Sequence, residues 1–567
     1  MDLSSEAVGS HQLGALGLIG SVIRELGIIE KIDARLPLNE SKGGVVSYGQ
    51  RVAAMILNGL GFMNSRLYMT PHYFADKPVA QLLDADITAD QLNDDCLGRG
   101  LDKLAGYGVT QLFSELAFEI ASEKGLLGKR FHLDSTSFVL YGDYENATES
   151  PIPAHGYSKA HRPDLKQVML SLTQGGVANL PLWMEALDGN SSDKRSFHET
   201  VQRVKQFANK LDNAPDDICF VVDAAFYDIE QLKLLDTVNW ITRVPATLTE
   251  CKSWLHSVDE TLHWEKVDEQ YQTTEKTLTV NGLEQRWVMV KSMPAYQREL
   301  NTLNRRLSKA YESLTKSLWH LSHQVFGCEE DANVAMKSIL KKEKYHTVDF
   351  QVIPIKKYIG RGRPTKDTPQ QVTGYRVEYI ISTSLDKLEK IKQRLGRFVL
   401  GTNQLDTNDL SAKEVLKQYK EQSQVESGFK FIKDNAFELS SFFLKTPARI
   451  GALMMVMTLC LMVYNFAQYH IRQCLEDNDD ALPNQLGKPV KNPTMKWIAE
   501  LMQAIAVVTI HQNNIKHRFV TNVNAIHKRI IAYFGPTALH IYGLPPDFYL
   551  QKIDYHNYKK IRDWCEM

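Results

Sequence analysis

The chain has 567 residues, which is enough for more than one domain and for a large hydrophobic core. Hydrophobic residues make up 43% of it and charged residues 23%, so the composition is that of a globular protein and excludes a disordered chain. The formal net charge of −1 excludes a protein whose whole surface attracts nucleic acid, so any DNA partner must be held by local basic patches.

The first part of the chain, from about residue 11 to 125, is predicted to be helical. Apolar residues recur every three or four positions in "LGALGLIGSVIRELGIIEKIDARL" and in "SYGQRVAAMILNGLGF". Thr88 and Gln91 have the spacing of a capping box, and Gly106 or Gly108 is expected to end the helix that follows. The N-terminus lacks the basic and apolar pattern of a secretory signal, which favours a cytoplasmic protein.

The pattern then changes to strands. Three short apolar or alternating runs, separated by Gly and Asn, are predicted to be successive strands: 131–142, 166–176 and 178–190. A helix pattern follows at 196–211, and the apolar run 218–226 indicates a strand in the middle of a sheet. This β-β-β-α-β order places Asp134 at the end of the first strand and Asp223 at the end of the fourth.

Residues from about 247 to 375 do not continue that sheet. Asn281-Gly282 lies between two alternating runs and predicts a type I′ hairpin. A long helix pattern carries leucines on one face, which either pair subunits or pack within this region: Leu300, Leu303, Leu307, Leu314, Leu318 and Leu321. Trp254, Trp264 and Trp287 lie in the same region and either stack a base or belong to its core.

After a strand pattern at 375–384, the chain is predicted to be mainly helical to about residue 535. The longest apolar stretch, 450–464, is shorter than the roughly 18 to 20 residues of a membrane span, so it is expected to be a buried core helix. The seven cysteines show no C-x-x-C spacing, which predicts neither a disulfide framework nor a zinc site and fits a reducing cytoplasm.

One helical segment in this part carries an unusual polar face. In "YKEQSQVESGFKFIKD" the residues Tyr419, Gln422 and Lys433 are seven before, four before and seven after Glu426. These offsets are close to whole helical turns, so the four side chains are expected to share one face. Taken alone, a Glu such as Glu426 is more typical of a solvated helix face. Taken alone, Asp134 and Asp223 are more typical of turn or cap residues.

Asp134, Asp223 and Glu426 together suggest a metal site. Two carboxylates from neighbouring strands and a third from a helix are suited to a hard cation such as Mg²⁺. Two such ions activate an attacking oxygen and stabilise the leaving oxygen in phosphodiester cleavage.

The strand order, the two aspartates and the string Tyr419-x2-Gln422-x3-Glu426-x6-Lys433 resemble the DDE transposases of bacterial insertion sequences. They are similar to the branch with a Y-(2)-R-(3)-E-(6)-K signature, whose RNase H-like core carries a β-rich insertion before the last acid. The segments 156–167, 187–197 and 241–245 and the N-terminal "DDCLGRGLDKL" also resemble that branch, so the resemblance covers nearly the whole chain. Gln422 departs from it, because an amide cannot make the bidentate, charge-assisted phosphate contact of the signature Arg.

The resemblance implies an α/β fold with an RNase H-like mixed sheet flanked by helices, a helical N-terminal domain and an α+β insertion. We predict five regions in chain order. They are a helical DNA-end-binding domain (1–125), the first part of the core (126–246), the insertion (247–375), the second part of the core with Glu426 (376–475), and a C-terminal helical region suited to dimerisation (476–567).

The function implied by the resemblance is a transposase that cuts the ends of an insertion sequence and joins them to target DNA. Asp134, Asp223 and Glu426 would be both catalytic residues and ligands of two Mg²⁺ ions, with Mn²⁺ as a substitute. The partners would be double-stranded DNA at terminal inverted repeats and at the target, bound by a homodimer, with no membrane and with the protein at the nucleoid. Two alternatives stay open: a structure-specific nuclease without strand transfer, and a domesticated DNA-binding protein that no longer cuts.

DNA contacts are expected from several polar and basic residues. By resemblance, Tyr419 and Lys433 handle the DNA end, and Gln422, at the position of the signature Arg, is a further candidate DNA contact. The basic loop near the first aspartate and the acid-free run 356–366 either bind phosphates or are solvated loops. Their candidate residues are Lys159, His161, Arg162, Lys166, Lys356, Lys357, Arg361 and Arg363.

Overall fold

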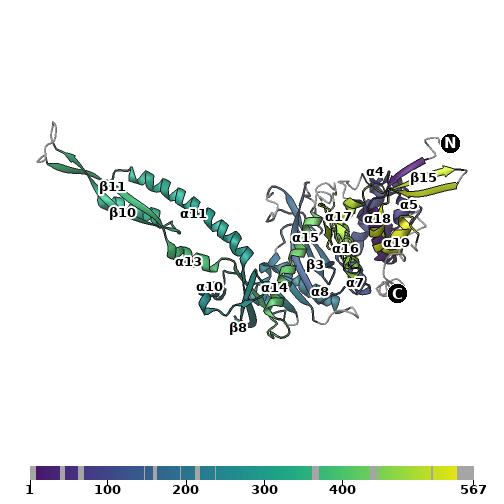
Figure 1. Cartoon of the computed structure of the whole chain (residues 1–567), viewed down its shortest axis with the longest axis horizontal. Helices are drawn as coiled ribbons and strands as arrows, with labels where there is room; N and C mark the ends of the chain where they lie inside the picture. The colour runs from purple at the N-terminus through teal and green to yellow at the C-terminus, as the bar shows by residue number, and fades with distance from the viewer. Residues whose placement is uncertain are drawn as a thin grey trace. The chain divides into compact units, whose positions relative to one another are not determined.

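The chain forms two compact units in the computed structural model (Figure 1). The first comprises Met1–Trp240 and Gln418–Met567, and the second comprises Ile241–Lys417. The structure describes residues 8–38, 45–61, 69–142, 144–145, 147–157, 162–191, 193–210, 217–235, 238–359, 369–433, 444, 446–512 and 515–545. The five predicted regions divide the chain more finely than these two units, and their boundaries stay predictions.

The first unit begins with a helical region, as predicted. Its helices are α1 (Leu16–Glu25), α2 (Ile28–Arg35), α3 (Tyr48–Leu60), α4 (Thr70–Phe74), α5 (Val79–Leu83), α6 (Asp94–Tyr107) and α7 (Val109–Glu123). The predicted capping box of Thr88 and Gln91 is confirmed, and it starts a short 3-10 helix before α6. Gly108 ends α6 with φ of 102°, a conformation that glycine adopts without steric cost.

The mixed sheet of the first unit contains the four predicted strands. They are β2 (Arg130–Leu140), β3 (Lys166–Gly175), β4 (Leu180–Leu187) and β5 (Cys219–Val222). β3 is antiparallel to both β2 and β4, whereas β5 is parallel to β2. The spatial order β4-β3-β2-β5, with α8 (Asp193–Ala208) between the last two strands in sequence, is the predicted RNase H-like arrangement. Every residue of β5 is buried, because the strand lies inside the sheet beneath packed helices.

The longest helix of the first unit, α16 (Pro447–Asp477), is its central core element. Among the described residues it is the one helix long and apolar enough to cross a membrane. Its residues from Ile450 to Val463 are all buried, and the helix packs against α3, α6, α7 and β4. The prediction that 450–464 is a buried core helix is therefore confirmed.

The end of the chain folds back onto its beginning. β15 (Ala506–Gln512) pairs with both β1 (Val8–Gln12) and β16 (Ile515–Thr521) in an antiparallel sheet. The helices around it are α17 (Met495–Leu501), α18 (Ala525–Tyr533) and α19 (Gly535–Ile541). This region was predicted to be mainly helical, and the hairpin of β15 and β16 was not predicted.

The strands of the second unit follow one another in the order β6-β12-β9-β8-β7. Its strands are β6 (Asn239–Arg243), in which the division between units falls, β7 (Glu265–Lys266), β8 (Tyr271–Val280), β9 (Leu283–Ser292) and β12 (Arg397–Thr402). Asn281 and Gly282 join β8 to β9 with φ of 48° and 82°. Positive φ at both central residues is what a type I′ turn requires, so the predicted hairpin is confirmed.

A second hairpin, β10 (His346–Tyr358) and β11 (Gln370–Thr383), lies along α11 (Met293–Ser322), as Figure 1 shows. The leucine face of α11 packs within this unit: Leu314, Leu318 and Leu321 share a core cluster with Val377 of β11 and with α12 (Glu329–Leu340). Trp254 and Trp287 are also buried and stack at 6.4 Å between ring centroids. These residues therefore serve the core of the insertion.

Candidate active site

Two of the predicted acids lie side by side at the end of the parallel strand pair. β2 and β5 are in register up to Leu133 and Val222, and the next residues are Asp134 and Asp223. Paired residues of neighbouring strands point to the same face of a sheet, and neighbouring strands lie about 4.8 Å apart. Both side chains are half-buried, so the two carboxylates face one partly solvated edge of the sheet.

Each of these carboxylates is held by a backbone N–H group. The Ser135 N–H donates to Oδ1 of Asp134 at 2.7 Å. The Ala225 N–H donates to Oδ1 of Asp223 at 2.8 Å, because Asp223 caps the short 3-10 helix that follows β5. Such hydrogen bonds orient a carboxylate and favour its ionised form.

The helix with Glu426, α15 (Ser423–Ile432), covers the same face of the sheet. Alternation along β2 puts Asp134 on one face with His132 and Phe138. The Lys433 ammonium lies 5.5 Å from the centre of the Phe138 ring, and α15 is in contact with β2. Asp134 and α15 are therefore on one side of the sheet.

Glu426 does not form a metal-binding group with the two aspartates in the part of the chain that the structure describes. Its side chain is exposed, and no group of three or more His, Cys, Asp or Glu side chains able to hold a metal ion is found within the described ranges. The donor chemistry of Asp134 and Asp223 fits a hard cation such as Mg²⁺, which prefers carboxylate oxygens. The structure thus brings together two of the three predicted ligands and places the third on the helix above their face.

The polar stripe predicted around Glu426 is divided between solvent and core. Gln422 lies between α14 (Ala412–Glu421) and α15 and is only 8% exposed, on the side of Val425, which is fully buried. Tyr419 is half-buried, whereas Glu426 and Lys433 are exposed. The offsets in sequence were close to whole turns, but burial separates Gln422 from the exposed pair.

The structure places only some of the predicted basic residues. Arg162 is exposed and pairs with Asp164, with 2.6 Å between Nη2 and Oδ2. Lys166 is half-buried at the start of β3, opposite Leu140. Lys356 and Lys357 are exposed at the end of β10. The remaining candidates lie outside the described residues: Lys159, His161, Arg361 and Arg363.

A buried polar pair lies beside the aspartates and was missed from the sequence. His132 of β2 is opposite Gln174 of β3 and only 4% exposed. Burial and the nearby Arg130 lower the pKa of His132 to about 4, so the imidazole is neutral at physiological pH. A neutral ring adds no positive charge next to Asp134. Its position two residues before Asp134 in "FHLDS" was the available signal.

Residues 128–465, more than half of the chain, match the family model described as "Transposase DDE domain". Residues 8–118 match "Domain of unknown function (DUF4277)". The search of curated proteins gave no match. Among solved structures, the piggyBac transposase synaptic complex with hairpin DNA is similar at 8% identity and a TM-score of 0.36, over 88% of this chain and 82% of that one. A likeness this distant carries no argument about function.

Proposed function

The chain belongs to the DDE transposase family, and from this premise we propose that it cuts the ends of an insertion sequence and joins them to target DNA. Asp134, Asp223 and Glu426 are the proposed catalytic acids. The observation that carries this proposal is that Asp134, inside β2, and Asp223, directly after β5, each follow the last paired residue of these two parallel strands, within the residues that match the transposase domain.

In this proposal, Asp134 and Asp223 hold divalent metal with the oxygens that their backbone hydrogen bonds orient. Two Mg²⁺ ions, or Mn²⁺ in their place, would supply Lewis-acid activation of the attacking oxygen and of the leaving oxygen. Glu426 contributes the third carboxylate from α15, on the face that Asp134 shares. Its exposed position suits a ligand that completes the set once DNA is bound.

The DNA end is proposed to lie along the exposed part of α15. The Lys433 ammonium at the end of this helix is a suitable contact for a phosphate. Tyr419, in the preceding helix α14, is proposed as a second contact with the DNA end. Arg162, Lys166, Lys356 and Lys357 are further proposed phosphate contacts. Two element ends must be joined in one reaction, so we propose that a homodimer binds the terminal repeats.

The test uses the purified chain with labelled duplexes of the DNA that flanks its own gene and with a target plasmid. We expect strand cleavage at the element ends in Mg²⁺, none in EDTA, and labelled ends joined to the plasmid. Cleavage without joining would instead identify a structure-specific nuclease. Specific binding without cleavage in Mg²⁺ or Mn²⁺ would identify a DNA-binding protein that no longer cuts, and either result would overturn the proposal.

A further inference from the structure

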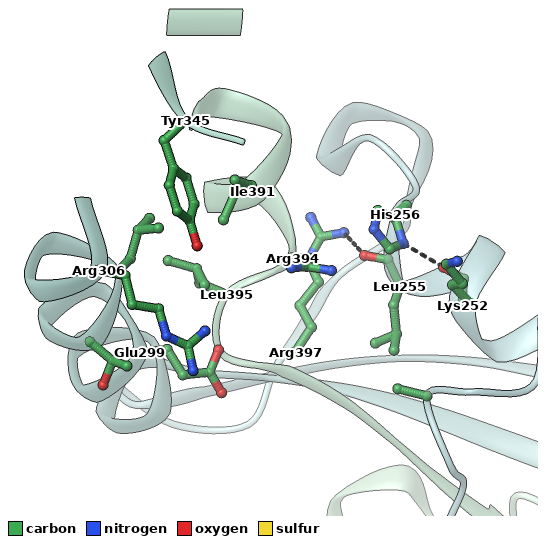
Figure 2. A pocket seen from close by; sticks show the side chains of 13 residues that line it. Lys252, Leu255, His256, Glu299, Arg306, Tyr345, Ile391, Arg394, Leu395 and Arg397 are labelled. Atoms are coloured by element: carbon green, nitrogen blue, oxygen red, sulfur yellow. Dashed lines mark hydrogen bonds between the residues drawn. The ribbon is translucent and has the colours of Figure 1, made fainter. Parts of the chain in front are cut away.

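The second unit contains a cavity that is separate from the proposed catalytic acids. It has a volume of about 390 Å³ and lies between α10 (Thr249–Leu255), the first half of α11, α13 (Leu385–Arg394) and the start of β12 (Figure 2). Ligand sites typically have volumes of about 300 to 1,000 Å³, so this cavity has room for a small molecule or one unit of a polymer.

The lining of the cavity is rich in cationic groups. Its basic residues are Lys252, His256, Arg306, Arg394 and Arg397. Glu299 is the one acidic residue among the lining residues that the structure describes, and its Oε2 accepts the Gly396 N–H at 2.9 Å. Figure 2 shows Glu299 beside Arg306 on the α11 wall. The cavity wall therefore carries more positive than negative charge.

One of these cations is fixed in place. Arg397 has a side chain that is 0% exposed, and its guanidinium donates to the carbonyl oxygens of Leu255 and Ser257 at 3.2 and 2.7 Å. It also pairs with Oδ1 of Asp259 at 2.6 Å. Its Nε–H is buried without a hydrogen-bond partner. A buried donor without a partner is costly, and an anionic ligand would satisfy it.

A tight turn holds Arg394 and Arg397 on the same wall. Gly396 lies between them with φ of +72°, and a Cβ atom there would meet the Ser292 oxygen at 2.6 Å and the Tyr296 nitrogen at 2.8 Å. Only glycine fits this conformation and this close approach. The backbone itself thus positions both arginines.

Counting charges leaves two cations uncompensated. The charge of Asp259 balances that of Arg397, with which it pairs. The charge of Glu299 balances that of Arg306, which lies beside it in Figure 2. Lys252 and Arg394 are exposed, and in the part of the chain that the structure describes no ion pair joins either side chain to an acid. Two free positive charges match the charge of a phosphate group.

The rest of the lining is apolar. Leu255, Leu303, Ile391 and Leu395 line it. Figure 2 shows the half-buried ring of Tyr345 at one side. Apolar walls with a few convergent polar groups are typical of a site for an organic ligand. The lining therefore suits a ligand that has both a phosphate and an apolar or aromatic body.

We propose that this cavity binds a nucleotide, with its phosphate at Lys252, Arg394 and Arg397 and its sugar and base against the leucine walls. The nucleotide is either free or part of a single DNA strand, since both present the same chemistry. The second source rests on the proposed function, whereas the site itself does not.

The test measures binding to the full chain without metal, so that no cleavage is needed. Titration calorimetry with deoxyadenosine monophosphate and with inorganic phosphate addresses the free ligand, and fluorescence anisotropy with a labelled oligothymidylate addresses the strand. The variants are Arg394→Gln and Lys252→Gln. Their matched controls are Arg305→Gln and Lys390→Gln, exposed residues of α11 and α13 that do not line the cavity.

We expect each cavity variant to raise the Kd about tenfold, in line with the loss of one charge-assisted hydrogen bond. The slope of log K against log salt for the oligonucleotide should fall by about 0.7, since one phosphate contact on a single strand is lost. The controls should bind as the wild type does. If the cavity variants bind the monophosphate more weakly than wild type does, the ligand is a free nucleotide. If they bind only the oligonucleotide more weakly, the ligand is a nucleotide within a DNA strand.

This inference would be overturned if cavity variants, controls and wild type had equal affinities. It would also be overturned if the wild type bound none of the three probes. It is independent of the catalytic proposal, because cleavage that persists without Asp134 and Asp223 would refute that proposal while leaving these affinities unchanged. Circular dichroism of each variant checks that it is folded.

Discussion

The carboxylate edge of the first unit and the cationic cavity of the second differ in both charge and construction. The edge is formed by Asp134 and Asp223 at one register position of two neighbouring strands, each held by a backbone N–H. The cavity collects its cations from α10, α11, α13 and β12, four elements spread over more than a hundred residues. One site is suited to a metal ion and the other to a phosphate, the two charged species that DNA chemistry requires.

The two sites differ in when they become organised. The two carboxylates at the edge repel each other, and a bound cation would relieve that repulsion. The cavity holds the Arg397 guanidinium in place by hydrogen bonds to Asp259 and to two carbonyl groups, so this side chain is positioned before any ligand arrives. The predictions below test these two arrangements.

The largest effect is expected from Asp134→Ala and Asp223→Ala. Each should lower Mg²⁺-dependent cleavage by more than about 100-fold. Loss of a residue that only supports a metal ligand costs up to about 100-fold, and loss of a direct ligand should cost more. Asp217→Ala is the control, because Asp217 precedes β5 and is exposed on the surface. End-labelled DNA cleavage gives the rates, and gel shifts should show unchanged DNA binding. Full activity in either variant would remove that residue from the site.

A smaller loss is expected from Glu426→Gln. Glu426 is exposed and forms no metal-binding group with the two aspartates among the described residues. We therefore expect cleavage to fall about 10- to 100-fold, the range for residues that support a metal site. Glu421→Gln, at the end of α14, is the matched control. Measuring the Mg²⁺ concentration for half-maximal cleavage separates the roles: a lost ligand shifts it, and an unshifted midpoint with normal rate would contradict the assignment.

The next effect is on stability, from Gln422→Arg. The resemblance would favour Arg at this position, but the side chain is only 8% exposed, so a guanidinium there must be desolvated or displace its neighbours. We expect the free energy of unfolding in urea to fall by about 1 to 3 kcal/mol. Ser423→Arg, at the exposed next residue, should change little. Equal stability of the two variants would show that position 422 reaches solvent.

The smallest effect concerns Glu343, which supports the cavity wall at Tyr345. Burial alone would raise the pKa of its carboxyl, but N–H donors of Tyr345 and His346 and the His346 ring at 3.0 Å hold that pKa below its ordinary value. A lowered acid pKa gives stability that is present above the unfolded-state pKa and is lost as pH falls through the folded-state pKa.

Glu343→Gln keeps the acceptor and removes the charge. At pH 7 it should therefore lower the free energy of unfolding by about 1 kcal/mol, within the range for hydrogen bonds to charged groups. The difference from wild type should be fully present above pH 4.5, the ordinary pKa of Glu, and should be lost as pH falls further, through the lower pKa of the folded state. Urea unfolding from pH 3 to 8 tests this, and a difference that persists at pH 3 would contradict it.

Prediction from sequence was most successful where structure is local. The capping box at Thr88, the turn at Asn281-Gly282 and the apolar periodicity of α16 each depend on a few neighbouring residues, and all three are confirmed. β15 and β16 were missed although they pair with each other in a local hairpin, and the second partner of β15, β1, is almost 500 residues away in the chain. The helical character of the segment around Glu426 was foreseen, but its division into α14 and α15 at Gln422 and the burial of Gln422 were not.

The sequence by itself determined the catalytic candidates and the family, because strand order and the spacing of acids are written along the chain. The adjacent positions of Asp134 and Asp223, and the position of α15 on the face of the sheet that carries Asp134, became known from the three-dimensional structure, since strand register and helix packing are long-range. That structure alone also revealed the cationic cavity. Lys252, Arg394 and Arg397 form no motif in sequence, and they converge because packing of separate elements brings them to one wall.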